Sequence, residues 1–332
     1  MKVFYASSAY RSFSRAARMN RVLISSHQHD LVSELAEADI VVLHCEPFKY
    51  PALFERHPSL RHKYVVACAA WEADPLPSLY TEGLSLVQEV WTPSTFSAAL
   101  FSSSHENVHL VPHPIYRDLS CDLGDFALID EAIRFSRDRR YFLTIARTVD
   151  KRKNIPALVE AFTSTFGRSN RDVLVIKGDP GEMRWKASEN VICIDANLTD
   201  FQINALYRRA SAYISAHHGE AWGLTISDAL LFRLPILATK WSGNLDYLSD
   251  SSAFLIPAQV RQIDSVDCFG LFEESMKWAY PSQGDISAAF ERVCSATADE
   301  LSERTEAAFS AANMFSMESV GATLAERLAA IT

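Results

Sequence analysis

The sequence predicts an α/β protein with two domains, and three observations lead to this prediction. At 332 residues, the chain exceeds the usual length of one domain, so two domains of about 100–200 residues each are expected. Short apolar runs alternate with stretches of helical periodicity, and this alternation occurs twice along the chain. Runs such as VLVIK and YFLTIA are too uniformly apolar for a one-sided sheet, so they indicate parallel strands covered on both faces.

The expected strands of the first half cover residues 2–6, 39–44, 64–69, 89–92 and 108–111, and its helices lie near 12–23, 30–38 and 94–103. The expected strands of the second half cover 141–146, 172–177, 191–194, 212–215, 235–238 and 253–256, and its helices lie near 154–166, 199–209 and 223–233. The strand pattern pauses between about 117 and 140, which predicts the connection between the domains. Beyond residue 265, only helices are expected.

Composition and charge exclude several classes of protein. Hydrophobic residues make up 48% and charged residues 22% of the chain, as is ordinary for a globular protein. The net charge of -9 argues against nucleic acid as a partner. The six cysteines lie far apart with no C-x-x-C pair, so neither a disulfide framework nor a zinc site is expected, and a reducing, cytoplasmic location is favoured.

Two nucleotide-binding motifs are absent from the sequence. A dinucleotide-binding fingerprint needs a glycine-rich turn after the first strand, but that turn reads SSAYRSFS and the first glycine of the chain is Gly83. The phosphate loop G-x-x-x-x-G-K-[ST] does not occur either. The sequence therefore argues against a nicotinamide-dependent dehydrogenase and against a P-loop NTPase.

The stretch HHGEAWGLTISDAL carries two acids, Glu220 and Asp228. We expect SAYISA to be a strand, HHGEAW the loop at its carboxyl end, and GLTISDALLF a helix that stops before Pro235. A helix N-terminus offers unpaired N–H groups and positive potential, which suit a phosphate. Acids on both sides of a phosphate can bind hydroxyl groups, so the stretch predicts a nucleotide sugar with its ribose near Asp228 and its hexose near Glu220.

Four segments together resemble a known family. They are E-A-W-G-L-T-I-S-D, RTVDKRKN, WEADPLPSLYTEGLSLVQEVWTPSTF and the carboxyl-terminal FSMESVGATLAERL. This set resembles glycosyltransferase family 4, which contains retaining enzymes of the GT-B fold. Asp228 stands where most members have Glu, and the first strand-helix turn lacks the glycines that many members have.

The resemblance implies a GT-B architecture, with two Rossmann-like domains facing each other across a deep cleft. An acceptor domain would cover residues 1–118 and a nucleotide-sugar donor domain 119–315, and a last helix at about 316–332 would pack back on the first domain. The implied catalytic residues are Glu220, Arg147, Lys153 and Glu72. The implied donor-binding residues are Asp228, Gly223, Trp222, Leu224, Asn197, Leu198 and Gly178.

Structural alternatives accompany these assignments. The two acids of the opening stretch are also suited to cap and charge a helix. Arg147 and Lys153 would otherwise be solvated surface charges, and Glu72 a structural partner of Trp71. The neighbouring His217 and His218 are better suited to loop packing than to binding a metal.

The implied reaction transfers a hexose from a GDP- or UDP-sugar to a hydroxyl of a saccharide or lipid-linked acceptor, with retention of configuration. The expected setting is bacterial polysaccharide, lipopolysaccharide or glycolipid synthesis. No cofactor and no metal are expected, because the chain has no D-x-D triplet. A catalytically silent relative that binds nucleotide sugars as a scaffold or regulatory subunit is the main alternative, and a nucleotide-sugar epimerase is another.

A basic segment near the amino terminus suggests a further partner. Its arginines, at positions 11, 15, 18 and 21, recur at helical spacing and are expected to line one helix face. A solvated face is one interpretation. Peripheral contact with an anionic membrane is the other, at about 1 kcal/mol per cation, and it would place the protein at the inner face of the cell membrane.

Overall fold

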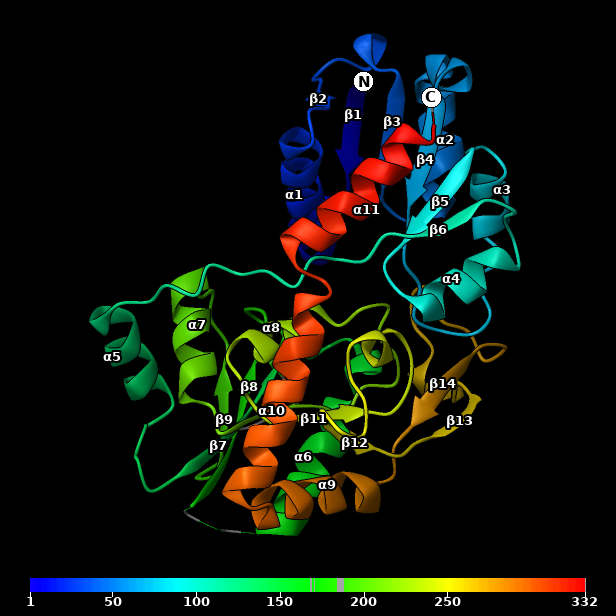
Figure 1. The fold of residues 1–332 in the computed structure, drawn as a ribbon. Coiled ribbons are helices and arrows are strands. Elements are labelled where there is room, and N and C mark those ends of the chain that lie inside the picture. The colour runs from blue at the N-terminus through cyan, green and yellow to red at the C-terminus, as the bar shows by residue number, and fades with distance from the viewer. Residues whose placement is uncertain (168, 170, 184–187, 332) are drawn as a thin grey trace.

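The structure is a computed structural model that describes residues 1–167, 169, 171–183 and 188–331. Two six-stranded parallel sheets form two α/β units, one above the other in Figure 1. The first sheet has the strand order β2-β1-β3-β4-β5-β6, and the second has the order β12-β11-β10-β7-β8-β9. The two predicted α/β domains with parallel sheets are confirmed.

The first unit contains the amino-terminal sheet. Its strands are β1 (Lys2–Ser7), β2 (Asp30–Leu31), β3 (Ile40–His44), β4 (Tyr64–Cys68), β5 (Glu89–Thr92) and β6 (Val108–Leu110). Its helices are α1 (Arg11–Ser26), α2 (Tyr50–Arg56), α3 (Tyr80–Leu84) and α4 (Thr95–Ser102). The helix predicted over 30–38 is wrong, because this segment begins as the edge strand β2, which pairs with β1, and then forms a short 3-10 turn.

The second unit follows a short helix, α5 (Leu123–Ala132), in the predicted connection. Its strands are β7 (Arg140–Ile145), β8 (Asp172–Lys177), β9 (Val191–Ile194), β10 (Ala212–Ser215), β11 (Ile236–Thr239) and β12 (Phe254–Ile256). Its helices are α6 (Ile155–Phe166), α7 (Asp200–Arg209), α8 (Leu224–Leu231), α9 (Gln283–Ser295) and α10 (Ala298–Asn313). The predicted strands of this unit are all present, within one residue at each end.

Strand β8 shows why the uniformly apolar runs form two-sided sheets. All six of its residues are buried. Successive side chains of a strand point to opposite faces, so Val173 and Val175 enter the core on one face of the sheet, whereas Leu174 and Ile176 enter the core on the other. A strand covered on both faces has no position for an exposed polar residue.

A hairpin arm joins the two units. It consists of β13 (Gln259–Gln262) and β14 (Lys277–Tyr280), which pair antiparallel, and the loop between them. Ile263, Met276 and Trp278 of this arm belong to the same buried cluster as Trp71 of the first unit. The prediction of helices alone beyond residue 265 is therefore wrong, because β14 is stabilised by pairing with β13 and by packing in the core of the first unit rather than by an apolar run of its own.

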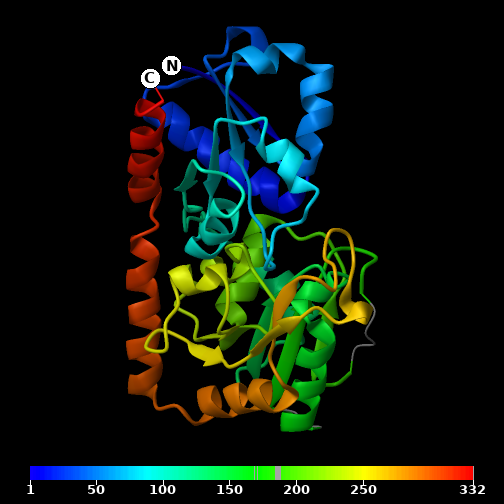
Figure 2. The ribbon, with the colours of Figure 1, turned by 90° about the vertical axis from the view of Figure 1, so that its right-hand side faces the viewer.

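The last helix, α11 (Met317–Ala329), returns to the first unit. Val320 and Leu324 pack with Val3 and Leu23, in the core beneath α1. Figure 2 shows α10 and α11 running along one side of the molecule, from the second unit to the first. The exact division at residue 118 stays a prediction. Within the described residues, no helix has the length and apolar composition needed to span a bilayer.

Candidate functional site

The strand order of the second sheet identifies the place where a ligand is expected. Counted from β7, its order is 3-2-1-4-5-6, which is the order of nucleotide-binding sheets. The order reverses between β7 and β10, and ligands of open α/β sheets bind at the carboxyl ends of the strands at such a point. Arg147 and Lys153 follow β7, and Glu220 follows β10, so three predicted residues lie on the two loops of this switch point.

Hydrogen bonds hold these two loops together. The side-chain amide of Asn154 donates to the carbonyl of Ala216 at 3.0 Å, and the backbone N–H of His218 donates to the carbonyl of Arg152 at 2.8 Å. Asn154 has a φ of 52°, a conformation that asparagine tolerates better than most residues. The loop after β7 is therefore fastened to the loop that carries Glu220.

Glu220 lies between two cations. Its Oε1 accepts a hydrogen bond from Lys153 Nζ, and its Oε2 lies 3.2 Å from Arg152 Nη1. Glu220 is 6% exposed, and this burial alone would raise its pKa. Lys153 and Arg152 outweigh burial and lower the pKa of Glu220 to about 2. The carboxylate is thus ionised at neutral pH.

Glu72 reaches this cluster from the first unit. Its Oε1 lies 3.7 Å from Arg152 Nη2, which also lies 3.1 Å from a carboxylate oxygen of Asp150. Burial raises the pKa of Glu72, and the nearby Arg152 lowers it in part. The guanidinium of Arg152 therefore lies between the predicted catalytic acids of both units, Glu72 and Glu220.

Arg147 has different partners from Lys153. Its Nη2 lies 2.6 Å from Glu182 Oε1, and its Nη1 donates to the hydroxyl of Tyr10. The guanidinium also lies over the ring of Tyr10, 5.4 Å from its centroid. Tyr10 belongs to the turn between β1 and α1, so a residue of the first unit covers this predicted donor-binding cation.

Asp228 lies inside α8, where it is 2% exposed. Both of its oxygens are engaged by Arg15 of α1, at 2.7 Å from Nη1 and 2.5 Å from Nη2. Arg117 Nη1 lies 3.3 Å from the same carboxylate. The predicted ribose-binding acid is thus paired with two arginines, and a role in binding ribose stays a prediction.

The start of α8 contains three of the predicted donor-binding residues, Trp222, Gly223 and Leu224. Gly223 precedes the helix with a φ of 88°, a conformation that glycine adopts without strain. Leu224 begins the helix and is partly buried against the core. Trp222 is 2% exposed, and its ring packs against Tyr247 and Phe315. The side chain of Trp222 is therefore part of the core, and its role in binding a ligand stays a prediction.

The three remaining predicted residues follow β8 and β9. Gly178 is buried, and a Cβ at this position would lie 3.0 Å from the side chain of Thr148. Asn197 is exposed, whereas Leu198 is partly buried against the core just before α7. Because β8 and β9 extend the sheet beyond β7, these residues lie at the same edge as Arg147, where base binding stays a prediction.

The sequence interpretation missed four residues of the site: Tyr10, Arg15, Arg117 and Arg152. Arg152 adjoins Lys153 in the sequence, which was a usable signal. The predicted basic face is not a free surface, because Arg15 pairs with Asp228 and Arg21 donates to the carbonyl of Tyr5 at 2.8 Å. Arg18 is exposed, and the side chain of Arg11 lies outside the described residues. Membrane contact thus loses two of its four proposed cations.

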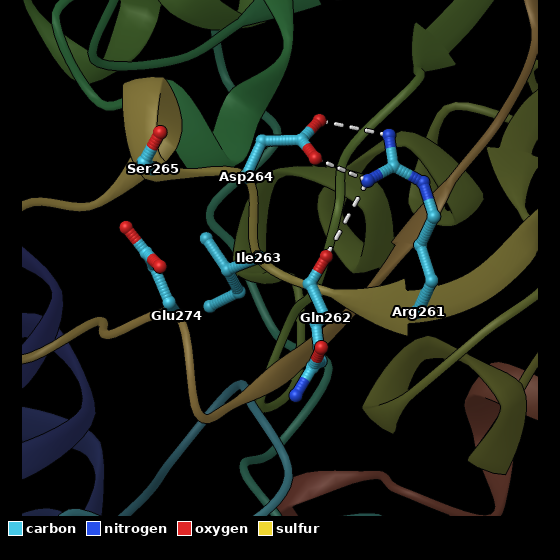
Figure 3. Close-up of a pocket in the computed structure, with 6 residues that line it drawn as sticks. All are labelled: Arg261, Gln262, Ile263, Asp264, Ser265 and Glu274. Carbon is cyan, nitrogen blue, oxygen red and sulfur yellow. Dashed lines mark hydrogen bonds and ion pairs between the residues drawn. The ribbon is translucent and has the colours of Figure 1, made fainter.

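An open hollow of about 390 Å³ lies on the hairpin arm (Figure 3). It is lined by Arg261, Gln262, Ile263, Asp264, Ser265 and Glu274. Arg261 Nη2 donates to Asp264 Oδ2 at 2.8 Å, so the main charges there are paired with each other. None of the predicted site residues lines this hollow. In the described part of the chain, no group of three or more His, Cys, Asp or Glu is placed to hold a metal.

Residues 125–267 match a family model described as glycosyl transferases group 1. A comparison of the sequence with curated proteins gives no match.

Solved structures extend the likeness to the whole chain. HepE from Anabaena, in complex with UDP-glucose, has a TM-score of 0.71 at 10% identity, and the match covers 99% of both chains. WaaG, a glycosyltransferase involved in lipopolysaccharide biosynthesis, has a TM-score of 0.64 at 13% identity over 98% of this chain and 99% of WaaG. The pneumococcal O-GlcNAc transferase GtfA, in complex with UDP and GlcNAc, has a TM-score of 0.62 at 15% identity; the match covers 96% of this chain and 59% of GtfA.

The chain spans little more than half of GtfA, but almost all of HepE and WaaG. At these identities, the likeness establishes the fold alone. The chain therefore has the GT-B fold of these glycosyltransferases, and its second unit carries the glycosyl transferases group 1 match.

Proposed function

We propose that this chain is a retaining glycosyltransferase that moves a hexose from a nucleoside diphosphate sugar to an acceptor hydroxyl. The main support is the cluster of Glu220, Lys153 and Arg152 at the switch point of the second sheet, close in sequence to the start of α8. A carboxylate that binds sugar hydroxyls then stands beside cations and a helix N-terminus that suit a diphosphate. UDP is the first nucleotide to test, because GtfA was solved with UDP and HepE with UDP-glucose.

In the proposed reaction, the bond between the anomeric carbon and the diphosphate oxygen breaks, and the acceptor oxygen bonds to that carbon on the same face. A phosphate oxygen of the leaving nucleoside diphosphate takes the acceptor proton, so no side chain has to act as the base. Lys153, Arg147 and the start of α8 offset the charge that develops on the leaving group. Glu220 binds the hexose, Asp228 the ribose, and Glu72 contacts the sugar or the acceptor.

The finer assignments of the nucleotide and the setting belong to the same proposal. The backbone at Asn197 and Leu198 would hold the base, and Gly178 would allow close approach of the donor. The reaction would need neither a cofactor nor a metal. The acceptor would be a saccharide or a lipid-linked saccharide of bacterial polysaccharide or glycolipid synthesis. The chain would work in the cytoplasm, at the inner face of the membrane if Arg11 and Arg18 contact anionic lipid.

One observation favours a second candidate, a silent relative that binds nucleotide sugars without turnover. Both oxygens of Asp228 are occupied by Arg15. Incubating the purified protein with UDP-, GDP- and ADP-sugars separates the candidates. Release of nucleoside diphosphate supports the transferase, whereas nucleotide binding without hydrolysis or transfer supports the silent relative. Conversion of the sugar without release of nucleotide would identify an epimerase.

A further inference from the structure

Arg15 and Asp228 form an ion pair across the boundary between the two units. Arg15 belongs to α1 of the first unit, and Asp228 to α8 of the second. The two terminal nitrogens of the guanidinium lie 2.7 and 2.5 Å from the two carboxylate oxygens. This two-pronged arrangement is the strongest hydrogen-bonded geometry that an arginine and a carboxylate adopt.

A ribose at this position would need the same oxygens. An ionised carboxylate only accepts hydrogen bonds, and the two ribose hydroxyls would donate to it as the two prongs of Arg15 do. Arg117 already lies 3.3 Å from one oxygen, and the Asp228 side chain is 2% exposed. Arg15 contacts both oxygens of the carboxylate and Arg117 contacts one, so a ribose that binds both oxygens has to replace Arg15.

We propose that Arg15 is an internal competitor of the donor nucleotide. In the ligand-free chain it takes the place of ribose at Asp228, and the nucleotide binds once Arg15 has left. This inference rests on the proposed function, because it requires Asp228 to hold the ribose of a donor.

The surroundings of the pair allow Arg15 to leave while Asp228 keeps a cation. The Arg15 side chain is 22% exposed, whereas that of Arg117 is 8% exposed. Arg117 is also anchored within the second unit, through a hydrogen bond to Asn204 and a 2.9 Å bond to the carbonyl of Asp200. Removing Arg15 therefore does not leave a buried carboxylate without a partner, which is the costly outcome for an ion pair.

A second contact of the same segment covers another donor group. The hydroxyl of Tyr10 accepts a hydrogen bond from Arg147, and Tyr10 lies just before the first residue of α1. The turn before α1, residues 8–10, contains no glycine and carries the large side chain of Tyr10. Arg15 thus contacts Asp228, the residue proposed to bind the ribose, and Tyr10 contacts Arg147, a residue proposed to bind the diphosphate.

If Arg15 competes with the nucleotide, removing its charge should increase the affinity of the protein for the nucleotide. When a site is open for only part of the time, its apparent dissociation constant equals the intrinsic constant divided by the open fraction. Arg15→Gln removes the charge and the fork, so it raises the open fraction. We expect UDP, or GDP if that is the nucleotide bound, to bind about 3- to 10-fold more tightly. A lysine can hold only one of the two oxygens well. The nucleotide affinity of Arg15→Lys is therefore expected to lie between those of wild type and Arg15→Gln.

Isothermal titration of wild type, Arg15→Gln, Arg15→Lys and Arg18→Gln with UDP, GDP and ADP tests this inference. Arg18 lies on the same helix and is exposed, so Arg18→Gln is the matched control and should bind as wild type does. Circular dichroism checks folding, and Arg15→Lys carries the test if Arg15→Gln does not fold. The competition is supported if the Arg15 variants bind nucleotide more tightly than wild type, or if they bind it and wild type does not.

Two outcomes overturn it, and they differ from each other. If wild type binds nucleotide and the folded Arg15 variants bind equally or more weakly, Arg15 does not compete, and the proposed function stands. If no variant and no wild-type protein binds UDP, GDP or ADP, the proposed donor function fails, and the competition fails with it.

Discussion

Lys153 and Glu220 form an ion pair between the loops that follow β7 and β10. The two strands are neighbours in the second sheet, at the point where the strand order reverses. Glu220 is 6% exposed, so its charge depends on the two cations beside it. The pair fixes the ammonium group beside the acid proposed to bind the hexose, where charge would develop on a leaving diphosphate.

Replacing Lys153 by alanine is expected to lower the turnover number by about 10²–10³-fold, because a preorganised group that offsets charge in the transition state is lost. The measurement is kcat for donor hydrolysis or transfer. Lys151→Ala is the matched control: Lys151 is exposed, and its ammonium group donates to the carbonyl of Val266. A Lys153→Ala enzyme with normal turnover would contradict this account of the diphosphate site.

Much of the fold could be predicted from the sequence, because buried parallel strands leave a clear apolar signal. Strand β8 is an example, and its predicted ends are confirmed. Strand β14 was missed, because it depends on pairing with β13 and on packing against Trp71 rather than on an apolar run of its own. Glu220 and Lys153 could be brought together from motifs, since both follow neighbouring strands. The pairing of Arg15 with Asp228 could not, because it depends on how the units face each other.

Glu220 also predicts a pH dependence of stability. Its pKa is lowered from 4.5 to about 2 in the fold, so the unfolded chain binds this proton at a higher pH than the folded chain does. The stabilisation is fully present above about pH 4.5 and is lost as the pH falls towards 2. We expect the free energy of unfolding of Glu220→Gln, measured by urea denaturation, to fall less steeply than that of wild type between these values. Parallel curves would show that Glu220 is not held ionised by Lys153 and Arg152.

A second pH dependence of stability, at higher pH, is expected from His217. It is fully buried, its two ring nitrogens lie within hydrogen-bonding distance of Ser215 and Asn244, and burial lowers its pKa from 6.5 to about 4. The folded chain therefore resists a proton that the unfolded chain binds, so stability is lost as the pH falls from about 6.5 to about 4. His217→Gln is expected to flatten the unfolding free energy in this window. His62→Gln, at an exposed histidine, is the control that should keep the wild-type slope.

Metal removal tests the charges proposed to hold the diphosphate. Because Arg147, Lys153 and the start of α8 would supply fixed positive potential, the transfer rate is expected to stay nearly unchanged in EDTA. The rate is measured with protein treated with EDTA, before and after Mn²⁺ or Mg²⁺ is added. Activity that disappears in EDTA and returns with Mn²⁺ would mean that a cation from solution does the work assigned here to the side chains.

The two units approach each other closely at Gly219, and a substitution there tests whether this contact is needed. A Cβ at this position would lie 2.2 Å from the carbonyl oxygen of Glu72 and 2.9 Å from the ring of Trp241. The first of these atoms belongs to the backbone of the other unit, so it cannot rotate away as a side chain does. Gly219→Ala therefore has to move the loop before Glu220 away from Glu72, which would also lengthen the contact between Glu72 and Arg152.

We expect Gly219→Ala to lower kcat/KM by about 10²-fold, because a shift of about 1 Å in a positioned group costs roughly that factor. Overpacking should also lower the free energy of unfolding by about 1–3 kcal/mol. Gly284→Ala is the control, since a Cβ there has Ser282 Oγ as its nearest neighbour, at 3.8 Å, and Gly284 lies in α9. Alanine favours a helix over glycine by up to about 1 kcal/mol, so Gly284→Ala should be as stable as wild type or more so, with normal activity. If Gly219→Ala keeps full activity, the close contact between the units is not needed for catalysis, and Glu72 has no part in the site.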